Sequence, residues 1–422
     1  MALKPLLALA CAALAATAAS AQVLPNLPDV TGTVGGVLDQ PLGDVERTTT
    51  DLSRRTVREL REAREVASRQ LLRRYPNQID TDPSGAIVVR NDVVAIAPTP
   101  EALEAARGRG FSIGQDVEAG ALGLRVVVLR APQGMTTREA VDALRTLDPS
   151  GAYDFNHLYL GAGGDTRISK QARSREGGSS GTRIGLIDSG VDADHRALNG
   201  VTLNQRGFAG DARVGAHGTA IASLISGADS GFHGAAPGAT LFVADVYGGQ
   251  PTGGGASAIV AAMNWLVQQR ASVINVSLVG PNNRAVEAAV RAAIARGHVV
   301  VAAVGNDGPA AAPLYPAAYP GVVGVTGVDG RNRVLPEAGR GPQVDFAAPG
   351  SDFAAASPTG GYAAVRGTSY AAPIVAGLIA RLGANAVAAD AVDLGARGAD
   401  QVFGAGLVGE DVRDGARRLA RR

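Results

Sequence analysis

The sequence predicts an α/β protein built on a doubly wound parallel sheet, preceded by a smaller α+β domain. From Thr182 onward, short runs of almost entirely apolar residues alternate with segments of helical pattern. Strands that lack apolar–polar alternation are buried on both faces, as in a parallel sheet covered by helices on each side. The predicted strands are Ile184–Ile187, Thr240–Val246, Val273–Val276, Val299–Val304 and Val322–Val325, and the predicted helices are His217–Ser226, Ala256–Arg270, Arg284–Arg296 and Tyr370–Leu382.

A different pattern at residues 88–160 predicts the smaller domain. Its elements follow the order βαββαβ, which is that of a ferredoxin-like fold. The predicted strands are Val93–Ala97, Phe111–Val117, Gly123–Leu129 and Ala152–Tyr159, and the predicted helices are Pro100–Arg109 and Thr136–Leu147. Residues 161–181 are polar and rich in glycine, so we expect a flexible, cleavable linker there. The larger domain then covers residues 182–409, and a C-terminal helix is expected at 410–422.

Length and composition fit this division. A chain of 422 residues is too long for one ordinary domain, so two folded units plus processed segments are expected. Apolar residues make up 46% of the chain, which is enough for a sizeable core. The net charge of +1 gives no electrostatic reason to expect nucleic acid as a partner.

Residues 1–21 have the pattern of a secretory signal. Lys4 supplies the positive start, Leu6–Ala16 the apolar stretch, and Ala19-Ser20-Ala21 a cleavage site of small residues. An uncleaved membrane anchor and a lipoprotein signal ending at Cys11 are the alternatives. Cys11 is the one cysteine of the chain, so cleavage after Ala21 leaves a protein that forms no disulfide and is no thiol enzyme. We therefore expect export to the periplasm or the extracellular space, with no transmembrane segment in the mature chain.

Residues 22–87 are expected to hold a linker followed by a basic amphipathic helix. The linker is rich in Pro, Gly and Asp, and the helix is predicted at Thr50–Tyr75 with a narrow apolar face among many arginines. Such a helix can lie on a membrane surface, or it can be a solvated helix packed on its neighbour.

Two polar residues stand where buried elements begin or end. Asp188 directly follows the strand Ile184–Ile187, and a carboxylate at the end of a buried strand is costly unless it is hydrogen-bonded. His217 precedes Gly218 and a helix of small residues, which lets an imidazole approach another backbone closely. In doubly wound folds, functional groups gather at the carboxyl ends of the strands.

Two further residues complete a possible catalytic group. Ser369 lies at the start of the buried helix that runs to Leu382, with Pro373 expected in the first turn. A serine in this place is usually a cap, but its hydroxyl can also attack a carbonyl while its N–H faces the resulting oxyanion. Asn306 ends the strand Val299–Val304 and can supply a second oxyanion donor, although Asn-Asp-Gly is also a plain turn sequence.

Together these segments resemble a known family. IDSGVD at 187–192, HGTAIAS at 217–223, GND at 305–307 and GTSYAAP at 367–373 look like the signature blocks of the subtilisin-like serine peptidases. The chain order Asp, His, Asn, Ser matches that family and differs from the order in chymotrypsin and in the α/β-hydrolases. The resemblance covers roughly Thr182 to Val408 and implies a subtilisin-like fold.

The resemblance implies a secreted serine endopeptidase made as a zymogen. Ser369 would form the acyl-enzyme, His217 would act as base and then acid, and Asp188 would hold the imidazole. Asn306 and the Ser369 N–H would bind the oxyanion. An inactive peptide-binding pseudo-peptidase and a surface adhesion protein with an accidental motif are the alternatives; a nucleotide-binding domain is excluded because no phosphate-cradling Gly-x-Gly-x-x-Gly opens a helix.

The same resemblance implies a substrate-binding region. One wall, which would pair with the substrate backbone, is Ser277, Leu278, Val279 and Gly280, and the facing wall is Ala303, Val304 and Gly305. Val279 stands where many relatives have glycine, and Leu314 is expected at the base of the pocket for the residue before the cut bond. Both fill space without charge, so we expect small or medium apolar residues there, unless the two residues are merely packing.

The domain at 88–160 resembles the inhibitory propeptide of this family. The implied partners are therefore polypeptide substrates and the chain's own N-terminal domain as an intramolecular inhibitor, with self-cleavage between Leu158 and Gly181. The acidic residue with which several relatives bind calcium after the Asp block is missing here, and residues 227–238 offer only Asp229. We therefore expect no metal site and no cofactor.

Overall fold

The computed structural model describes residues 68–161, 167–176 and 181–413, all of which fall in one compact unit. The expected secretory signal, the first linker and residues 50–67 of the basic helix lie outside the described residues. The same holds for residues 414–422 of the expected C-terminal helix. None of the helices in the described part of the chain has the length and apolar character that a membrane span requires.

The larger domain contains a sheet of seven strands, and all of its strand pairs are parallel. Its order is β18-β17-β16-β14-β8-β13-β9. The central strands are nearly devoid of polar side chains and are buried, which agrees with their position between two helical layers. The strands are β8 (Arg183–Asp188), β9 (Leu203–Gly207), β13 (Thr240–Asp245), β14 (Val273–Val276), β16 (Val299–Ala303), β17 (Val323–Val328) and β18 (Phe346–Pro349).

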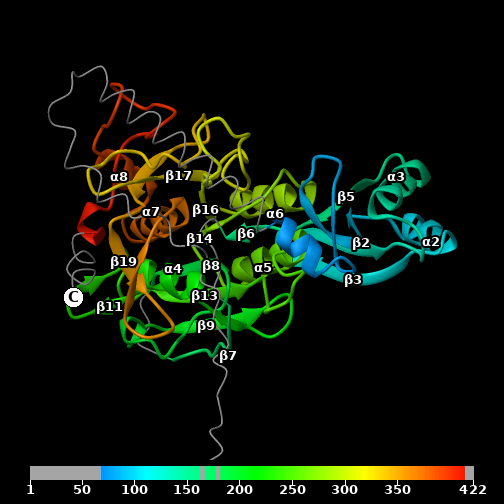
Figure 1. The fold of residues 1–422 in the computed structure, drawn as a ribbon, viewed down its shortest axis with the longest axis horizontal. Helices are drawn as coiled ribbons and strands as arrows, with labels where there is room; N and C mark the ends of the chain where they lie inside the picture. Colours follow the sequence, from blue (N-terminus) through cyan, green and yellow to red (C-terminus); the bar gives the residue numbers. More distant parts are fainter. Residues whose placement is uncertain (1–67, 162–166, 177–180, 414–422) are drawn as a thin grey trace, which may run out of the picture. The chain divides into compact units, whose positions relative to one another are not determined.

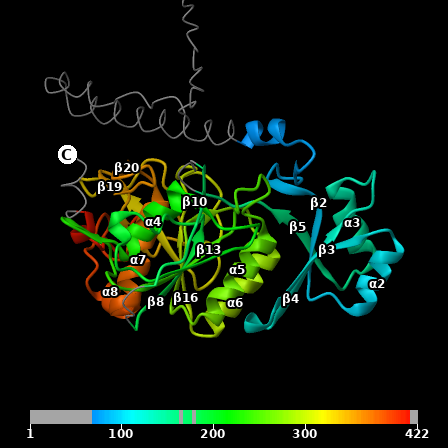
Figure 2. The same ribbon diagram turned by 90° about the horizontal axis from the view of Figure 1, so that it is seen from below.

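Helices cover both faces of this sheet. On one face α4 (Ala216–Ser226) packs against α7 (Thr368–Leu382), which crosses the central strands. On the other face lie α5 (Ala256–Gln268) and α6 (Arg284–Ala295), which pack on each other (Figures 1 and 2). The predicted doubly wound α/β fold is therefore confirmed, and α4 and α7 bring the His217 and Ser369 segments together.

The smaller domain has the strand order β5-β2-β4-β3, with all pairs antiparallel. This is the ferredoxin-like order expected from the βαββαβ pattern. One face of its sheet packs on its own helices, around Val127, Leu144 and Tyr153. Its elements are β2 (Ile87–Ile96), α2 (Pro100–Gly108), β3 (Ser112–Ala119), β4 (Leu124–Arg130), α3 (Thr137–Leu147) and β5 (Ala152–His157), with β1 (Ile79–Thr81) paired to β2.

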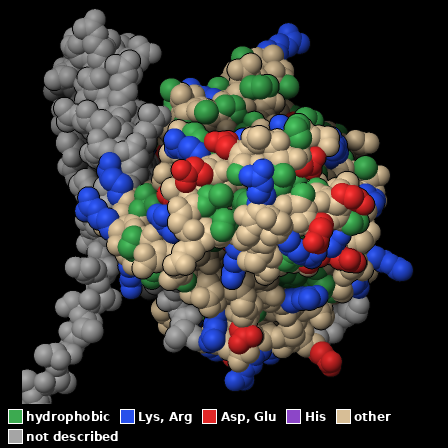
Figure 3. All heavy atoms as spheres, turned by 90° about the vertical axis from the view of Figure 1, so that its right-hand side faces the viewer, with side chains coloured by type: hydrophobic (Ala, Val, Ile, Leu, Met, Phe, Trp, Pro, Cys, Tyr) green, Lys and Arg blue, Asp and Glu red, His purple; other side chains and the backbone are tan. Residues whose placement is uncertain are grey.

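The other face of the small sheet packs on α5 and α6 (Figure 2). Val94, Val117 and Val126 join Ile259 and Val290 in one buried apolar cluster. The face bearing α2 and α3 shows acidic and basic side chains interspersed, with apolar groups scattered among them (Figure 3). The small domain thus docks through an apolar sheet face and turns its charged side to solvent.

Part of the segment expected to be a flexible linker is a strand. β7 (Arg167–Gln171) pairs antiparallel with β10 (Arg213–Gly215), the strand that leads directly into α4. The Lys170 ammonium lies 2.6 Å from Asp192 Oδ1 and 2.9 Å from Asp194 Oδ2. Backbone pairing and these ion pairs fix residues that composition alone assigned to a linker.

Candidate active site

Asp188 and His217 form a buried pair at the carboxyl edge of the large sheet. His217 Nδ1 lies 2.8 Å from Asp188 Oδ2 and 3.0 Å from Oδ1. The N–H and the hydroxyl of Ser189 donate to Asp188 Oδ1, at 2.8 and 3.3 Å, so the carboxylate is held in one orientation. A Cβ at Gly218 would collide with the Ser189 carbonyl, which explains why glycine follows His217. The arrangement fixes the imidazole tautomer with its proton on Nδ1.

Ser369 lies in the first turn of α7, the helix that packs on the His217 helix α4. The helix begins at Thr368 with Gly367 as N-cap, so Ser369 is inside the helix and is no cap. Its side chain is buried, and Ser369 Oγ has no hydrogen-bond partner among the described residues. The ring of Tyr370, the next residue, lies 5.3 Å from the His217 ring, centroid to centroid. A buried hydroxyl without a partner is rare in proteins and fits a reactive group better than a structural one.

The expectation that Pro373 lies in the first turn of its helix is wrong. Pro373 is inside α7, four residues after Ser369, where it cannot donate to the Ser369 carbonyl. That carbonyl instead accepts a hydrogen bond from Ser277 Oγ at 3.0 Å, and Ser277 Oγ accepts from Asn275 Nδ2 at 2.9 Å. Because Pro373 leaves the Ser369 carbonyl without its helical donor, this carbonyl is free to bind Ser277. The loop after β14 holds the Ser369 segment through this bond.

Asn306 faces the same point as Ser369. The Thr368 N–H donates to Asn306 Oδ1 at 3.1 Å, which turns the amide nitrogen to the other side. A Cβ built on Gly367 would lie 2.9 Å from Asn306 Nδ2 and 3.6 Å from Ser369 Oγ. Gly367 has φ of +137°, so glycine both adopts this backbone and leaves room between the two groups. The Asn306 amide and the N-terminal N–H groups of α7 can stabilise a negative oxygen formed next to Ser369.

The expected substrate-binding residues lie in and around β15, at the end of β16 and in the loop that follows it. Leu278 and Val279 make up the short strand β15, and Gly280 exchanges two backbone hydrogen bonds with Tyr315, of 2.9 and 3.0 Å. Ser277, Leu278, Val279, Ala303 and Val304 are buried. A Cβ at Gly305 would lie 2.5 Å from Leu314 Cδ1, so the Leu314 side chain fills the space beside Gly305.

The end of the small domain adds a strand to β15. β6 (Leu160–Gly161) pairs antiparallel with β15, with Val279 opposite Leu160 and Leu278 opposite Gly161. The Tyr159 N–H donates to the Gly254 carbonyl at 2.8 Å on the other side of the segment. Gly161 reaches the imidazole, because a Cβ there would lie 3.9 Å from His217 Nδ1. The chain thus runs between two backbone walls up to the Asp188–His217 pair.

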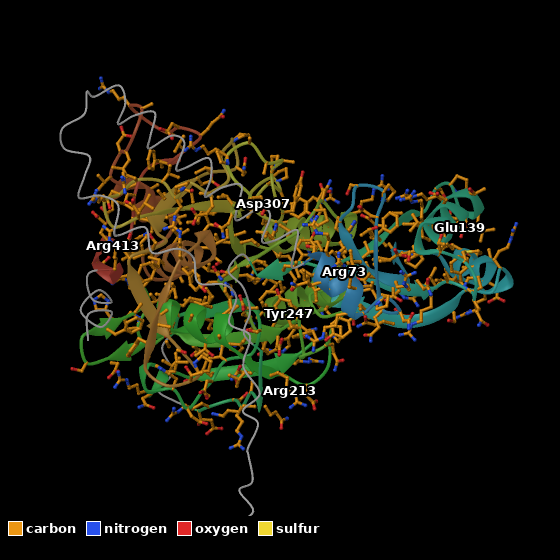
Figure 4. The ribbon with its side chains drawn as sticks, in the orientation of Figure 1. Arg73, Glu139, Arg213, Tyr247, Asp307 and Arg413 are labelled. Carbon is orange, nitrogen blue, oxygen red and sulfur yellow. The ribbon has the colours of Figure 1, made fainter. Side chains whose placement is uncertain are left out.

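Tyr159 anchors this segment. Its ring is fully buried, its hydroxyl donates to the Pro281 carbonyl at 2.9 Å, and its own carbonyl accepts from Tyr247 Oη at 3.2 Å. A Cβ at Gly280 would lie 2.6 Å from the ring, so glycine makes room for it. Burial raises the pKa of the Tyr159 hydroxyl well above its usual value. Tyr247 and Asp307, labelled in Figure 4, lie in the loops after β13 and β16.

The small domain also caps two helices of the large one. Asp154 Oδ2 accepts from the Arg284 N–H at the start of α6, at 2.9 Å. Asn156 Oδ1 accepts from the Ser257 N–H at the start of α5, at 3.2 Å. Gly255, the N-cap of α5, has no side chain to do this. Helix N-termini favour acceptors and negative charge, so these contacts stabilise docking.

These docking residues were not predicted from the sequence. Asp154 and Asn156 alternate with Tyr153 and Phe155 on β5, whereas Tyr159 lies two residues after this strand, and none of the three belongs to a motif. The Gly253-Gly254-Gly255 run was the available signal, since glycines allow a backbone to approach another chain closely.

No group of three or more His, Cys, Asp or Glu side chains in the described part of the chain is arranged to hold a metal ion. Asp229, the one acidic residue of 227–238, is engaged by protein groups. Arg196 Nε lies 3.0 Å from Asp229 Oδ2, and the Tyr362 hydroxyl donates to the same oxygen at 2.8 Å. Burial acts to raise the pKa of this carboxyl, but its hydrogen bonds and the nearby Arg196 outweigh it, so the pKa is lowered.

Comparison with known proteins agrees with the site. The subtilase family model matches residues 179–391, about half of the chain. The chain is 34% identical to subtilisin E of Bacillus subtilis (strain 168) over 211 residues, which are 48% of this chain and 55% of that protein. It is 32% identical to thermitase of Thermoactinomyces vulgaris over 236 residues, which are 54% of this chain and 84% of that protein.

Solved structures show the same fold. The structure of fervidolysin from Fervidobacterium pennivorans, described as a keratinolytic enzyme related to subtilisin, aligns with a TM-score of 0.64 at 21% identity. The alignment covers 77% of this chain and 61% of fervidolysin. The fold, the order of the motifs and the matches over residues 179–391 lead to one assignment: this chain belongs to the subtilase family of serine peptidases.

Proposed function

We propose that the chain is an exported serine endopeptidase that hydrolyses peptide bonds through an acyl-enzyme on Ser369 and is made as a zymogen. The observation that carries the catalytic part is the buried Asp188–His217 pair, together with a buried Ser369 hydroxyl on the helix packed against α4 that has no partner among the described residues. The signal-like residues 1–21 support export, and the docked small domain supports the zymogen.

The mechanism follows from the positions of these groups. His217 takes the proton of Ser369 Oγ as the oxygen attacks the substrate carbonyl, and it later gives this proton to the leaving amine. Asp188 accepts from Nδ1 and stabilises the imidazolium. The oxyanion is stabilised by Asn306 and by the Ser369 N–H. Water then attacks the acyl-enzyme with His217 again as base, which releases the acid and restores the serine.

The small domain acts as an intramolecular inhibitor in this proposal. Its last residues pair with β15 in the way expected of substrate, and they reach His217 at Gly161. β7 lies beyond the site and is paired with β10, so a cut between Gly161 and Arg167 would leave β7 on the peptidase. Ala162, the small residue directly after Gly161, is the best candidate for the position before the cut bond.

Processing provides the first prediction. The purified wild-type protein is expected to give a mature chain that starts between Gly163 and Arg167, as read by N-terminal sequencing. The Ser369→Ala protein, which lacks the nucleophile, is expected to keep the small domain attached. A mature start near Gln22 in the wild type would show that the domain is retained, and an identical cut in Ser369→Ala would show that another peptidase makes it.

Specificity provides the second prediction. Leu314 fills the space next to Gly305, so peptides with Ala or another small or medium apolar residue before the cut bond are expected to be the best substrates. Leu314→Gly is expected to raise kcat/KM for peptides with Phe at this position by about 10–100-fold. Adding or removing one or two apolar groups in a pocket changes kcat/KM by about that factor. The assay uses peptides that differ at this position alone. A wild-type preference for Arg or Lys, or no change in Leu314→Gly, contradicts this assignment.

Chelation provides the third prediction. Asp229 is already paired with Arg196 and hydrogen-bonded by Tyr362, so a divalent cation adds nothing that the protein lacks there. The Tm is expected to be equal in EDTA and in millimolar calcium. A calcium-dependent rise in Tm that Asp229→Asn abolishes would contradict it.

A further inference from the structure

A partly buried ion pair, Glu337–Arg366, joins two segments that adjoin the proposed oxyanion site. Arg366 Nε is 2.8 Å from Glu337 Oε1, and Arg366 Nη2 donates to Glu337 Oε2 at 2.9 Å. The Glu337 side chain is only 3% exposed, whereas that of Arg366 is 42% exposed. A two-point contact of this kind fixes orientation as well as distance.

Each partner belongs to a segment that adjoins one half of the oxyanion site. The Glu337 carbonyl accepts from the Gly308 N–H at 2.8 Å, and the Gly339 N–H donates to the Gly305 carbonyl at 3.0 Å. The Glu337 segment is therefore hydrogen-bonded to both ends of the Gly305–Gly308 loop, which carries Asn306. Asp307 marks this loop in Figure 4.

Arg366 lies on the other half. It directly precedes Gly367 and Thr368, the cap and first residue of α7, whose second residue is Ser369. The Asn306 and Ser369 segments touch directly through the Thr368 N–H to Asn306 Oδ1 at 3.1 Å and the Gly305 N–H to Thr368 Oγ1 at 3.2 Å. The Glu337–Arg366 ion pair is a further, charged link between the Asn306 and Ser369 segments, in addition to these two neutral hydrogen bonds.

We propose that Glu337 is a positioning residue that, through its ion pair with Arg366, sets the Asn306 amide against the Ser369 N-terminal turn in the oxyanion geometry. This inference rests on the proposed function of the site. Neither residue touches substrate in this role. Its effect is made in the transition state alone, so disturbing it lowers kcat and leaves KM nearly unchanged.

The test is a double-mutant cycle with Asn306. Glu337→Gln keeps the shape and removes the charge, and Arg366→Met removes the guanidinium from the exposed side. Each is expected to lower kcat by about 10-fold, a part of the 10²–10³ that an oxyanion donor provides, with KM changed by about twofold or less. In the Asn306→Ala background neither variant is expected to lower kcat further, because the group that they position is gone.

The kinetics are normalised to active sites titrated with a fluorophosphonate, so that unfolded protein does not count. Glu410→Gln is the control for the loss of an Arg–Glu ion pair elsewhere in the fold, because Glu410 lies 2.6 Å from Arg413 in a pair well away from the Asp307 loop (Figure 4). It is expected to leave kcat unchanged.

An unchanged kcat in Glu337→Gln, with or without a lower Tm, overturns the proposal, and so does an equal loss in both backgrounds. If Asn306→Ala alone does not lower kcat, the proposed oxyanion role of Asn306 fails together with this inference. If Asn306→Ala lowers kcat as expected and Glu337→Gln does not, this inference is wrong but the oxyanion role of Asn306 stands.

Discussion

Replacement of Ser369 by alanine is expected to lower kcat by about 10⁶-fold, and replacement of His217 by alanine by a similar factor. This magnitude is the one known for subtilisin, a relative of this chain. Ser369 supplies the nucleophile and His217 makes it reactive, so the loss of either leaves the same residual activity. The double variant is therefore expected to be no slower than either single variant.

The measurement is hydrolysis of a peptide with Ala before the cut bond, on protein freed of its small domain by an added peptidase where the variant cannot process itself. Ser226→Ala is a suitable control, because Ser226 is also a buried serine, donating to the Ala239 carbonyl at 3.1 Å. It is expected to retain full turnover. Additive losses in the double variant, or substantial turnover in Ser369→Ala, would contradict the assignment of the triad.

Replacement of Asn306 by alanine is expected to lower kcat by about 10²–10³-fold with little change in KM. The range is that for a side-chain oxyanion donor in a subtilisin. The Asn306 carbonyl oxygen is held by the Thr368 N–H at 3.1 Å, so the amide nitrogen is oriented before substrate arrives. Its interaction strengthens as the substrate oxygen becomes negative, which is why the loss falls on kcat.

Steady-state kinetics of Asn306→Ala and Asn306→Asp test this. The aspartate has nearly the same shape and can still accept from Thr368, but it lacks the donor and adds a negative charge next to the oxyanion. It is expected to be at least as slow as the alanine variant. Wild-type kcat in Asn306→Asp would remove Asn306 from the mechanism.

The fold and the catalytic residues could be predicted because they depend on local patterns. The strand Val273–Val276 was predicted with its bounds, and α3 and α7 to within two residues, since apolar runs and capping residues such as Thr136 mark their ends. β9 and β18 were missed. β9 is polar along most of its length and joins the sheet at one edge. β18, at the other edge, has two alanines and a proline after Phe346 and so lacks the β-branched residues that favour a strand.

Contacts between distant segments could not be predicted. Asp154 caps a helix that lies 130 positions later in the chain, and neither residue carries a signal for the other. The position of Pro373 was misjudged for a related reason, because the compensating donor to the Ser369 carbonyl is Ser277, which lies in the loop after β14 and far away in the sequence. The strand conformation of residues 167–171 likewise depends on pairing with β10, which composition does not reveal.

Labelling of the purified, matured protein with a fluorophosphonate probe tests the central claim most directly, with Ser369→Ala beside it. The account predicts stoichiometric labelling of the wild type and none of the alanine variant, because only an activated hydroxyl reacts with this probe. A folded and processed wild-type protein that is not labelled would contradict it, and would leave a peptide-binding protein with the subtilase fold.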